Sequence, residues 1–390
     1  MNVKSPNKDN QKVIYEKSQS FSMFISQLEN DQEKCRLRCC SVLEQAIPQE
    51  VSSYKKEILQ LVLNDLKDTS TENKSFKLTT FITDELSRIS DEHLPRYFFH
   101  RYRYDIFPKQ KKLDQYPPYL QIEPASVCNY RCVFCYQTDA SFADKKNGFM
   151  GTMSFDLFKE IIDQSEGNIE FFSLASRGEP FVCKDIDQML EYCRGKFLGF
   201  KINTNASLLN ERHCHAILSG GVNTMVISAD AAVEPLYSQM RVGGKLERVI
   251  KNLELFYQIK NKQYPKSKLI TRVSGVKFNE KQSMDSMKEV WGPLVDQVCF
   301  VDYNPWENVY DSPVSQVDEP CSDLWRRMFV WYDGKVNPCD TDYKSTLAVG
   351  SVEGTRLSEL WRNAEYEQLR FKHLNNLRKE QEPCRRCTVI

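Results

Sequence analysis

The chain has 390 residues, and its 53 Lys and Arg residues balance 53 Asp and Glu residues, so the formal net charge is zero. This balance argues against a broad electrostatic grip on nucleic acid or anionic lipid. No apolar run approaches the roughly 18 residues of a membrane span, and the polar N-terminus lacks a secretory signal. The sequence therefore predicts a cytoplasmic protein, and dividing its length by about 150 residues per domain gives two or three domains.

Residues 1–115 are predicted to form a helical N-terminal region, because Glu, Lys, Gln and Leu are frequent and apolar residues recur at helical spacing. Residues 97–112 interleave aromatic and basic side chains, a pattern that can stack on single-stranded nucleic acid. The same pattern also suits rings packed on a neighbouring domain beside basic chains that reach solvent. With zero net charge, the sequence favours the second interpretation.

Strands and helices alternate from residue 118 onward. Six strand–helix units with short connections imply a parallel sheet, and six strands are too few to close an eight-stranded barrel. The expected fold class is therefore α/β, with a partial, open (β/α)6 barrel that resembles a TIM barrel. Strands are predicted at 119–125, 169–175, 199–204, 224–229, 268–275 and 297–302.

After Tyr303 the alternation stops. Residues 328–338 are typical of a hairpin with a type I′ turn at Asp333-Gly334, and one helix is predicted from about Leu357 to Leu374. This small Cys-rich α+β domain is too short to have much core of its own. The predicted domains are the helical region 1–115, the barrel 116–305 and the C-terminal domain 306–390.

Cysteine is the most informative residue type, since the chain has 14 of them. Disulfides are disfavoured in a large chain without a secretion signal, so clustered cysteines indicate metal or redox chemistry. Seven of them form two groups. The first is Cys128, Cys132 and Cys135, and the second is Cys321, Cys339, Cys384 and Cys387. No ligand role is predicted for the others, which are Cys35, Cys39, Cys40, Cys183, Cys193, Cys214 and Cys299.

The first group places three thiolates within eight residues, on the loop after a strand. Three thiolates can hold three corners of a four-iron cluster and leave one iron open, whereas zinc would need a fourth ligand. An open iron can bind the amine and carboxylate of an amino-acid-like ligand, which suggests S-adenosylmethionine (SAM).

The segment Cys128-Asn-Tyr-Arg-Cys132-Val-Phe-Cys135 resembles the signature of the radical SAM superfamily, including the aromatic Phe134 before the third cysteine. The resemblance implies a [4Fe-4S] cluster with SAM bound to it. It also implies SAM contacts from the Gly178-Glu179-Pro180 motif, although the family commonly has Gly in place of Arg177, and a pairing of Arg241 with the methionyl carboxylate. Further contacts are expected at the ends of later strands, from Asn203, Asn205, Ser228 and residues 273–276.

The four cysteines of the second group can hold zinc or ligate a second cluster completely, and their spacing does not separate the two. The surrounding sequence resembles the twitch or SPASM-type domain of radical enzymes, which implies a second, auxiliary [4Fe-4S] cluster. With only four cysteines, the layout is similar to that of radical SAM aminocyclitol dehydrogenases.

The resemblance implies that reductive cleavage of SAM yields a 5′-deoxyadenosyl radical, which abstracts hydrogen from a substrate. The expected reaction is oxidation of a carbinol in a sugar, cyclitol or similar small molecule, with the auxiliary cluster as electron acceptor. Glu123, Asp230 and Asp302 are the candidate bases. The expected partner is an electron donor such as flavodoxin or ferredoxin. No binding to a membrane or to nucleic acid is expected. Two alternatives remain, a radical maturase that modifies a peptide or protein and a non-catalytic iron–sulfur or zinc protein.

Overall fold

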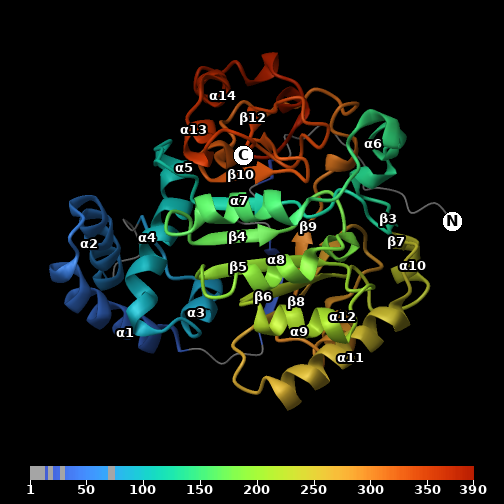
Figure 1. The fold of residues 1–390 in the computed structure, drawn as a ribbon, viewed down its shortest axis with the longest axis horizontal. Coiled ribbons are helices and arrows are strands. Elements are labelled where there is room, and N and C mark those ends of the chain that lie inside the picture. The colour runs from blue at the N-terminus through green and yellow to red at the C-terminus, as the bar shows by residue number, and fades with distance from the viewer. Residues whose placement is uncertain (1–13, 16–20, 27–30, 69–74) are drawn as a thin grey trace.

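The computed structural model describes residues 14–15, 21–26, 31–68 and 75–390 of the chain (Figure 1). Within these residues ten strands form one sheet in the order β1-β9-β8-β6-β5-β4-β2-β10-β11-β12, and β3 pairs with β7 in a second. The strands are β1 Phe21–Ser26, β2 Tyr119–Ile122, β3 Arg131–Cys132, β4 Phe171–Leu174, β5 Gly199–Thr204, β6 Thr224–Ser228, β7 Arg241–Val242, β8 Ile270–Lys277, β9 Gln297–Asp302, β10 Arg327–Val330, β11 Lys335–Asn337 and β12 Gly350–Ser351.

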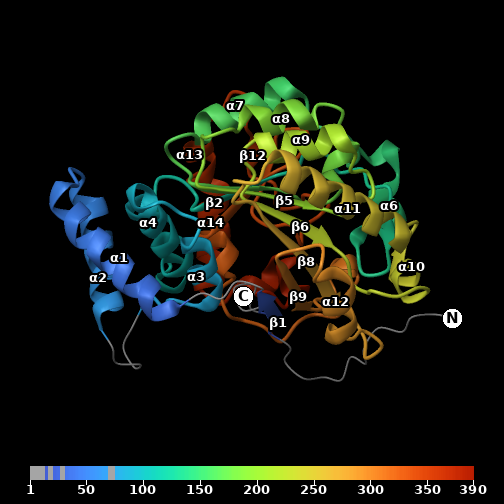
Figure 2. The same ribbon diagram turned by 90° about the horizontal axis from the view of Figure 1, so that it is seen from below.

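Helices α7, α8, α9 and α11 lie along the outer side of the curved sheet, and α1 to α4 lie together at one end of it (Figure 2). The helices are α1 Gln32–Ala46, α2 Ser53–Lys67, α3 Thr80–Leu86, α4 Leu94–Asp105, α5 Phe107–Gln110, α6 Ala140–Ala143, α7 Phe155–Ser165, α8 Ile186–Tyr192, α9 Glu211–Ser219, α10 Leu236–Met240, α11 Leu246–Gln263, α12 Met284–Trp291, α13 Leu357–Trp361 and α14 Ala364–Leu374.

The six predicted barrel strands are confirmed. They are β2, β4, β5, β6, β8 and β9, and each pairs in parallel with the next. Alternate residues of each strand pack on the outer helices; Phe200 and Ile202 of β5, for example, share one core with Ile161 of α7 and Leu190 of α8. Since the carboxyl ends of parallel strands meet at one edge, the loops that follow them gather there.

The N-terminal region is helical from α1 to α5, but the prediction of an all-helical region is wrong at Phe21–Ser26. This segment forms β1, which pairs antiparallel with β9 at the edge of the sheet. Unpaired backbone groups on an edge strand favour pairing with a further strand. Local residue spacing does not reveal a partner so distant in sequence. Residues 1–13, 16–20, 27–30 and 69–74 of the predicted region lie outside the described residues.

Helix α4 carries most of the aromatic and basic segment, and its rings are buried. Tyr97 and Phe98 belong to a core that also contains Tyr119 of β2 and Phe171 of β4, so α4 packs against the amino-terminal ends of the barrel strands. The Arg103 guanidinium pairs with Asp114 at 2.5 Å. Burial of most of the rings and the ion pair of Arg103 favour the packing interpretation over nucleic-acid binding.

The predicted C-terminal hairpin forms, and β10 also pairs in parallel with β2, so it extends the barrel sheet. Its turn is not type I′. The loop between the paired residues Trp331 and Lys335 has three residues, and among them only Gly334 has a positive φ, of 80°. The Gly334 N–H donates to the Trp331 carbonyl at 2.9 Å. The loop is therefore a turn followed by a glycine in the left-handed backbone conformation. The single helix predicted at 357–374 is also wrong, because α13 ends at Trp361 and Asn363 caps α14.

Candidate active site

The first cysteine group lies on the loop after β2, at the carboxyl edge of the barrel. Cys132 is buried, and Cys128 and Cys135 are half-buried. Strand β3 pairs with β7, which sets Cys132 directly opposite Arg241 in the ladder. Two segments more than 100 residues apart in sequence are thereby fixed side by side at the barrel mouth.

Arg241 interacts with several side chains around the first cysteine group. Its Nη1 donates to Cys132 Sγ at 3.6 Å, its Nε donates to the Asp230 carboxylate, and its guanidinium lies 5.4 Å from the centre of the Phe134 ring. Burial raises the pKa of the Cys132 thiol, and the Arg241 charge opposes that shift. A buried arginine beside these thiols is suited to a site that collects negative charge.

Gly178 and Glu179 pack against the same loop from the end of β4. A Cβ at Gly178 would lie 2.4 Å from the carbonyl oxygens of Ala125 and Val127, so only glycine fits there. The Glu179 N–H donates to the Val127 carbonyl at 3.0 Å. Just before the motif, Ser176 has a φ of 137°, the kind of strain that gathers at functional sites.

The Glu179 carboxylate is held by three donors. The Thr204 hydroxyl donates to it at 2.6 Å, the Asn205 N–H at 2.7 Å and the Phe181 N–H at 3.3 Å. Burial nevertheless raises the pKa of Glu179 to about 7. A buried carboxylate at this position is poised to pair with a ligand cation, which would restore its ionised form.

The remaining predicted contact residues also reach the barrel mouth. Asn205 donates to Asn129 at 3.0 Å, next to Cys128. Asn203 and Ser228 lie half-buried near the ends of β5 and β6. Among the described residues, the buried Oδ1 of Asn203 has no hydrogen-bond partner, and such an orphaned atom indicates a missing ligand or water.

Two of the three candidate bases are already engaged. Both Glu123 oxygens accept hydrogen bonds from Arg177, at 2.6 and 2.7 Å, with both side chains buried. Asp230 accepts from Arg241 and, at 2.7 Å, from the Val276 N–H. Asp302, at the end of β9, is exposed. Donors therefore occupy both oxygens of Glu123 and both oxygens of Asp230.

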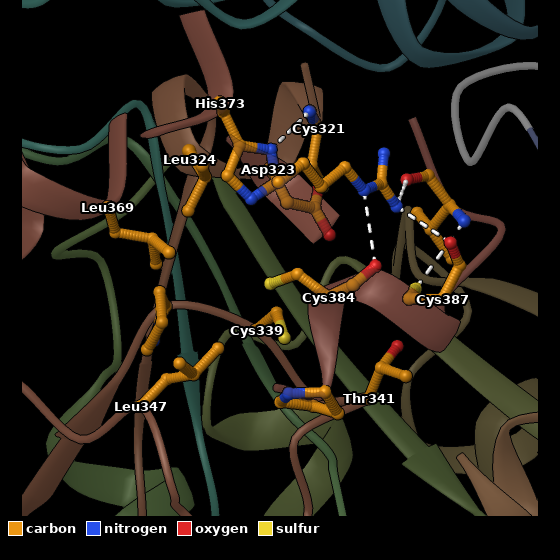
Figure 3. Close-up of a pocket in the computed structure, with 14 residues that line it drawn as sticks. Cys321, Asp323, Leu324, Cys339, Thr341, Leu347, Leu369, His373, Cys384 and Cys387 are labelled. Atoms are coloured by element: carbon orange, nitrogen blue, oxygen red, sulfur yellow. Dashed lines mark hydrogen bonds between the residues drawn. The ribbon is translucent and has the colours of Figure 1, made fainter. Parts of the chain in front are cut away.

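The second cysteine group surrounds one cavity in the C-terminal domain (Figure 3). Side chains from elsewhere in the domain fix its loops. Arg378 donates to the Cys387 carbonyl at 2.8 Å and to the Cys384 carbonyl at 3.2 Å, and Asn337 donates to the Cys339 carbonyl at 2.7 Å. The Cys321 N–H donates to His373 Nδ1 at 3.2 Å. All four predicted ligands are therefore brought together.

The donor sets fit iron–sulfur clusters. The first site offers three thiols with a cationic and an anionic side chain nearby, and the second offers four thiols around a shared cavity. In the described part of the chain, no group of three or more Cys, His, Asp or Glu side chains converges closely enough to hold a single metal ion.

A small aromatic cluster connects the two sites. Tyr136, which follows Cys135, stacks on Tyr343 with ring centres 4.9 Å apart. Cys135 of the first group and Cys387 of the second both pack against this cluster, whose buried members are Tyr136, Phe142, Val309 and Tyr343. This contact could not be predicted from the sequence, because it depends on how the C-terminal domain packs against the barrel.

The other seven cysteines, for which no ligand role is predicted, lie mostly in the core. Cys39, Cys40, Cys183, Cys193, Cys214 and Cys299 are buried, and Cys35 is half-buried on α1. They are spread over three helices or their ends, a loop and a strand, as small apolar core residues often are.

Comparisons with known proteins agree with this geometry. Residues 122–282 match the Radical SAM superfamily model, and residues 321–388 match SPASM, an iron–sulfur cluster-binding domain. GTP 3′,8-cyclase of Clostridium botulinum (strain Hall) is 27% identical over 35% of this chain and 42% of its own length. Mycofactocin maturase MftC of Mycobacterium ulcerans is 26% identical over 35% of this chain and 36% of its own length. The chain thus spans less than half of these curated relatives.

Among solved structures, BtrN in complex with AdoMet and 2-DOIA is similar, with a TM-score of 0.46 and 17% identity, over 69% of this chain and 92% of that one. The two domain matches cover both cysteine groups, so the cofactors that they imply are a [4Fe-4S] cluster with SAM and auxiliary iron–sulfur binding. None of the described helices is long and apolar enough to cross a bilayer.

Proposed function

For this chain, which is built from a radical SAM domain and a SPASM domain, we propose that it oxidises a carbinol of a sugar, cyclitol or similar small molecule. The observation that carries the proposal is the packing of Cys135 and Cys387 on one aromatic cluster. A ligand of each site touches the same few rings, which suits the passage of an electron from one site to the other.

Cys128, Cys132 and Cys135 would hold the first cluster, and Cys321, Cys339, Cys384 and Cys387 would hold the second. With both clusters and SAM bound, the cofactors supply a 5′-deoxyadenosyl radical that removes one hydrogen atom from the substrate and an acceptor for the one electron that remains. Conversion of the carbinol to a ketone is then balanced by loss of the hydroxyl proton.

The chain's own residues position the reactants. We assign the methionyl amine to Glu179 and the methionyl carboxylate to Arg241, each of which is a buried charge of opposite sign to its ligand group. Asn203 and Ser228 add polar contacts from the next two strands, and Phe134 packs beside Arg241. Enclosure by the barrel excludes water from the reacting carbon.

The cytoplasm is the compartment we propose, because all 14 cysteines are free thiols and a reducing environment keeps them available as ligands. A flavodoxin or ferredoxin would supply the reducing electron there. We also propose a small molecule, rather than an extended peptide, as the substrate.

The experiment uses anaerobically reconstituted protein, SAM and dithionite, with release of 5′-deoxyadenosine as the readout. Polyols and cyclitols are added in one arm and short peptides in the other. We expect a polyol to stimulate release and to be recovered as its ketone. The matched variant Cys339→Ala/Cys384→Ala should still release deoxyadenosine but lose ketone formation. Stimulation by peptides alone would favour a maturase, and no release in any arm would favour a non-catalytic metal protein.

A further inference from the structure

Some polar side chains that face the barrel interior keep partial exposure to solvent. Phe200 and Ile202, which face the outer helices, are 1% and 0% exposed. Lys201 and Asn203 alternate with them and so point to the interior, where both keep partial exposure. Ser274 of the neighbouring β8 is also partly exposed. A column of polar, incompletely covered side chains therefore lines the lumen.

Helix α4 closes the lower end of this lumen. His100 stacks on Phe171 of β4 with ring centres 4.0 Å apart and an interplanar angle of 6°. Tyr104 contacts Tyr119 of β2 with ring centres 5.6 Å apart. The N-terminal region thus forms a floor at the amino-terminal ends of the strands, opposite the cysteine loop.

Lys201 lies just above this floor without an anionic partner. Its ammonium is 5.9 Å from the centre of the Tyr119 ring. Within the described ranges, it has no hydrogen bond or ion pair to any side chain or carbonyl. A largely enclosed ammonium without such a partner is costly, because neither water nor a counter-charge fully replaces its hydration.

Of the groups that face Lys201, two are cationic and one is a carboxylate. They are Arg327 of β10, Tyr104 of α4, Arg272 of β8 and Glu85 of α3. The only carboxylate among them, Glu85, accepts from the Tyr97 hydroxyl at 2.7 Å and lies 3.8 Å from Arg101. Burial, followed by the charge of Arg327, lowers the pKa of Lys201 to about 8.

We propose that Lys201 binds an anionic group of the substrate, a carboxylate or a phosphate, at the floor of the barrel lumen. This inference rests on the proposed function and deepens it by naming the class of substrate as an anionic hydroxyl compound. A bound anion would give the Lys201 ammonium the direct partner that it lacks among the described residues, whereas Arg327 already lies 3.8 Å from Asp323 and Arg272 donates to Gln297 at 2.7 Å. It would also direct the other end of the substrate upward, toward Asn203 and the cysteine loop.

The test measures anion binding to reconstituted holoenzyme saturated with SAM. Acetate and inorganic phosphate are the two probes, chloride at matched ionic strength is the reference, and the shift in melting temperature with anion concentration gives the affinity. We expect one probe to bind the wild type and Lys251→Met, which removes an exposed lysine of α11, and the better probe identifies the anion as carboxylate or phosphate. Lys201→Met should lose at least about tenfold in affinity, and Lys201→Arg should restore binding.

The pH profile provides a second readout. Binding to the wild type should weaken about tenfold per pH unit above 8, as Lys201 loses its proton, whereas Lys201→Arg should show no such decline. Equal binding by Lys201→Met and wild type, or no binding of either anion to the wild type, would overturn the inference. Deoxyadenosine release by the wild-type sample is measured in parallel, so that failure of the proposed function is recognised separately.

Discussion

Arg177 and Glu123 form a two-pronged ion pair between the ends of the neighbouring strands β4 and β2. The Arg177 Nε and Nη2 atoms donate to the two Glu123 oxygens at 2.7 and 2.6 Å, and the Arg177 N–H donates at 3.0 Å. The same guanidinium donates to the Tyr343 carbonyl at 2.9 Å and lies 4.2 Å from the Trp331 ring. The residue that replaces the usual glycine therefore ties the barrel to the C-terminal domain.

Loss of one partner of this pair should strongly destabilise the protein. Glu123→Ala would leave the Arg177 charge buried without compensation, which costs about 3–5 kcal/mol in comparable pairs. Chemical denaturation of the anaerobic protein measures the loss. The double variant Glu123→Leu/Arg177→Met should recover most of the stability, because it leaves no unpaired charge. A Glu123→Ala variant as stable as the wild type would contradict this account of the pair.

Gly178 should be irreplaceable because the carbonyls of Ala125 and Val127 lie where a Cβ would be. Gly178→Ala would push the motif away from the cysteine loop, and a displacement of about 1 Å can cost about 100-fold in rate. Deoxyadenosine formation measures this loss. Gly167→Ala is the control, because a Cβ there meets no atom and only the φ of 78° is unfavourable. It should cost about 1–2 kcal/mol of stability and leave the rate unchanged.

SAM binding should depend on the protonation of Glu179. Its pKa is raised to about 7 by burial, so the carboxyl group is neutral below that pH and cannot attract the methionyl ammonium. Affinity should therefore fall about tenfold per pH unit below 7 and level off above it. Anaerobic calorimetry across this range checks the profile. In Glu179→Gln the affinity should be weak at every pH, and an unchanged pH profile in that variant would rule out the assignment.

Asp342 should be needed to keep iron in the C-terminal domain. Its carboxylate accepts from the Leu347 N–H, the Thr346 N–H and hydroxyl, and the Tyr310 hydroxyl, at 2.5 to 3.0 Å. Asp342→Asn leaves at least one buried donor unpaired, at a cost of about 1–3 kcal/mol, in the loop that follows Cys339. We expect iron content to fall from about eight to about four per chain. The exposed Asp311→Asn should retain all of it, and full iron in Asp342→Asn would contradict the prediction.

The sequence was sufficient for the features that depend on local pattern and order. The alternation from residue 118 predicted the six parallel strands, and the cysteine spacing predicted both groups. The family resemblance singled out Arg241 as a SAM contact, and the β3–β7 pairing gives the physical basis for its position beside Cys132.

What the sequence did not reveal depends on long-range packing. The pairing of β1 with β9 joins segments more than 270 residues apart, so no local period signals it. Glu123 was a reasonable candidate base until its partner Arg177 was seen to hold both oxygens. Lys201 was missed because a lysine within a strand looks like a surface residue, and only the curvature of the sheet turns it inward.

The most direct test of the two-cluster account is iron content combined with SAM cleavage, measured on the same anaerobically reconstituted sample after dithionite reduction. The account predicts about eight irons per chain and release of 5′-deoxyadenosine. The variant Cys128→Ala/Cys132→Ala/Cys135→Ala should keep about four irons and release none. Absence of both iron and cleavage in the wild type would contradict the account. About four irons with one zinc would remove the electron-acceptor role from the C-terminal domain.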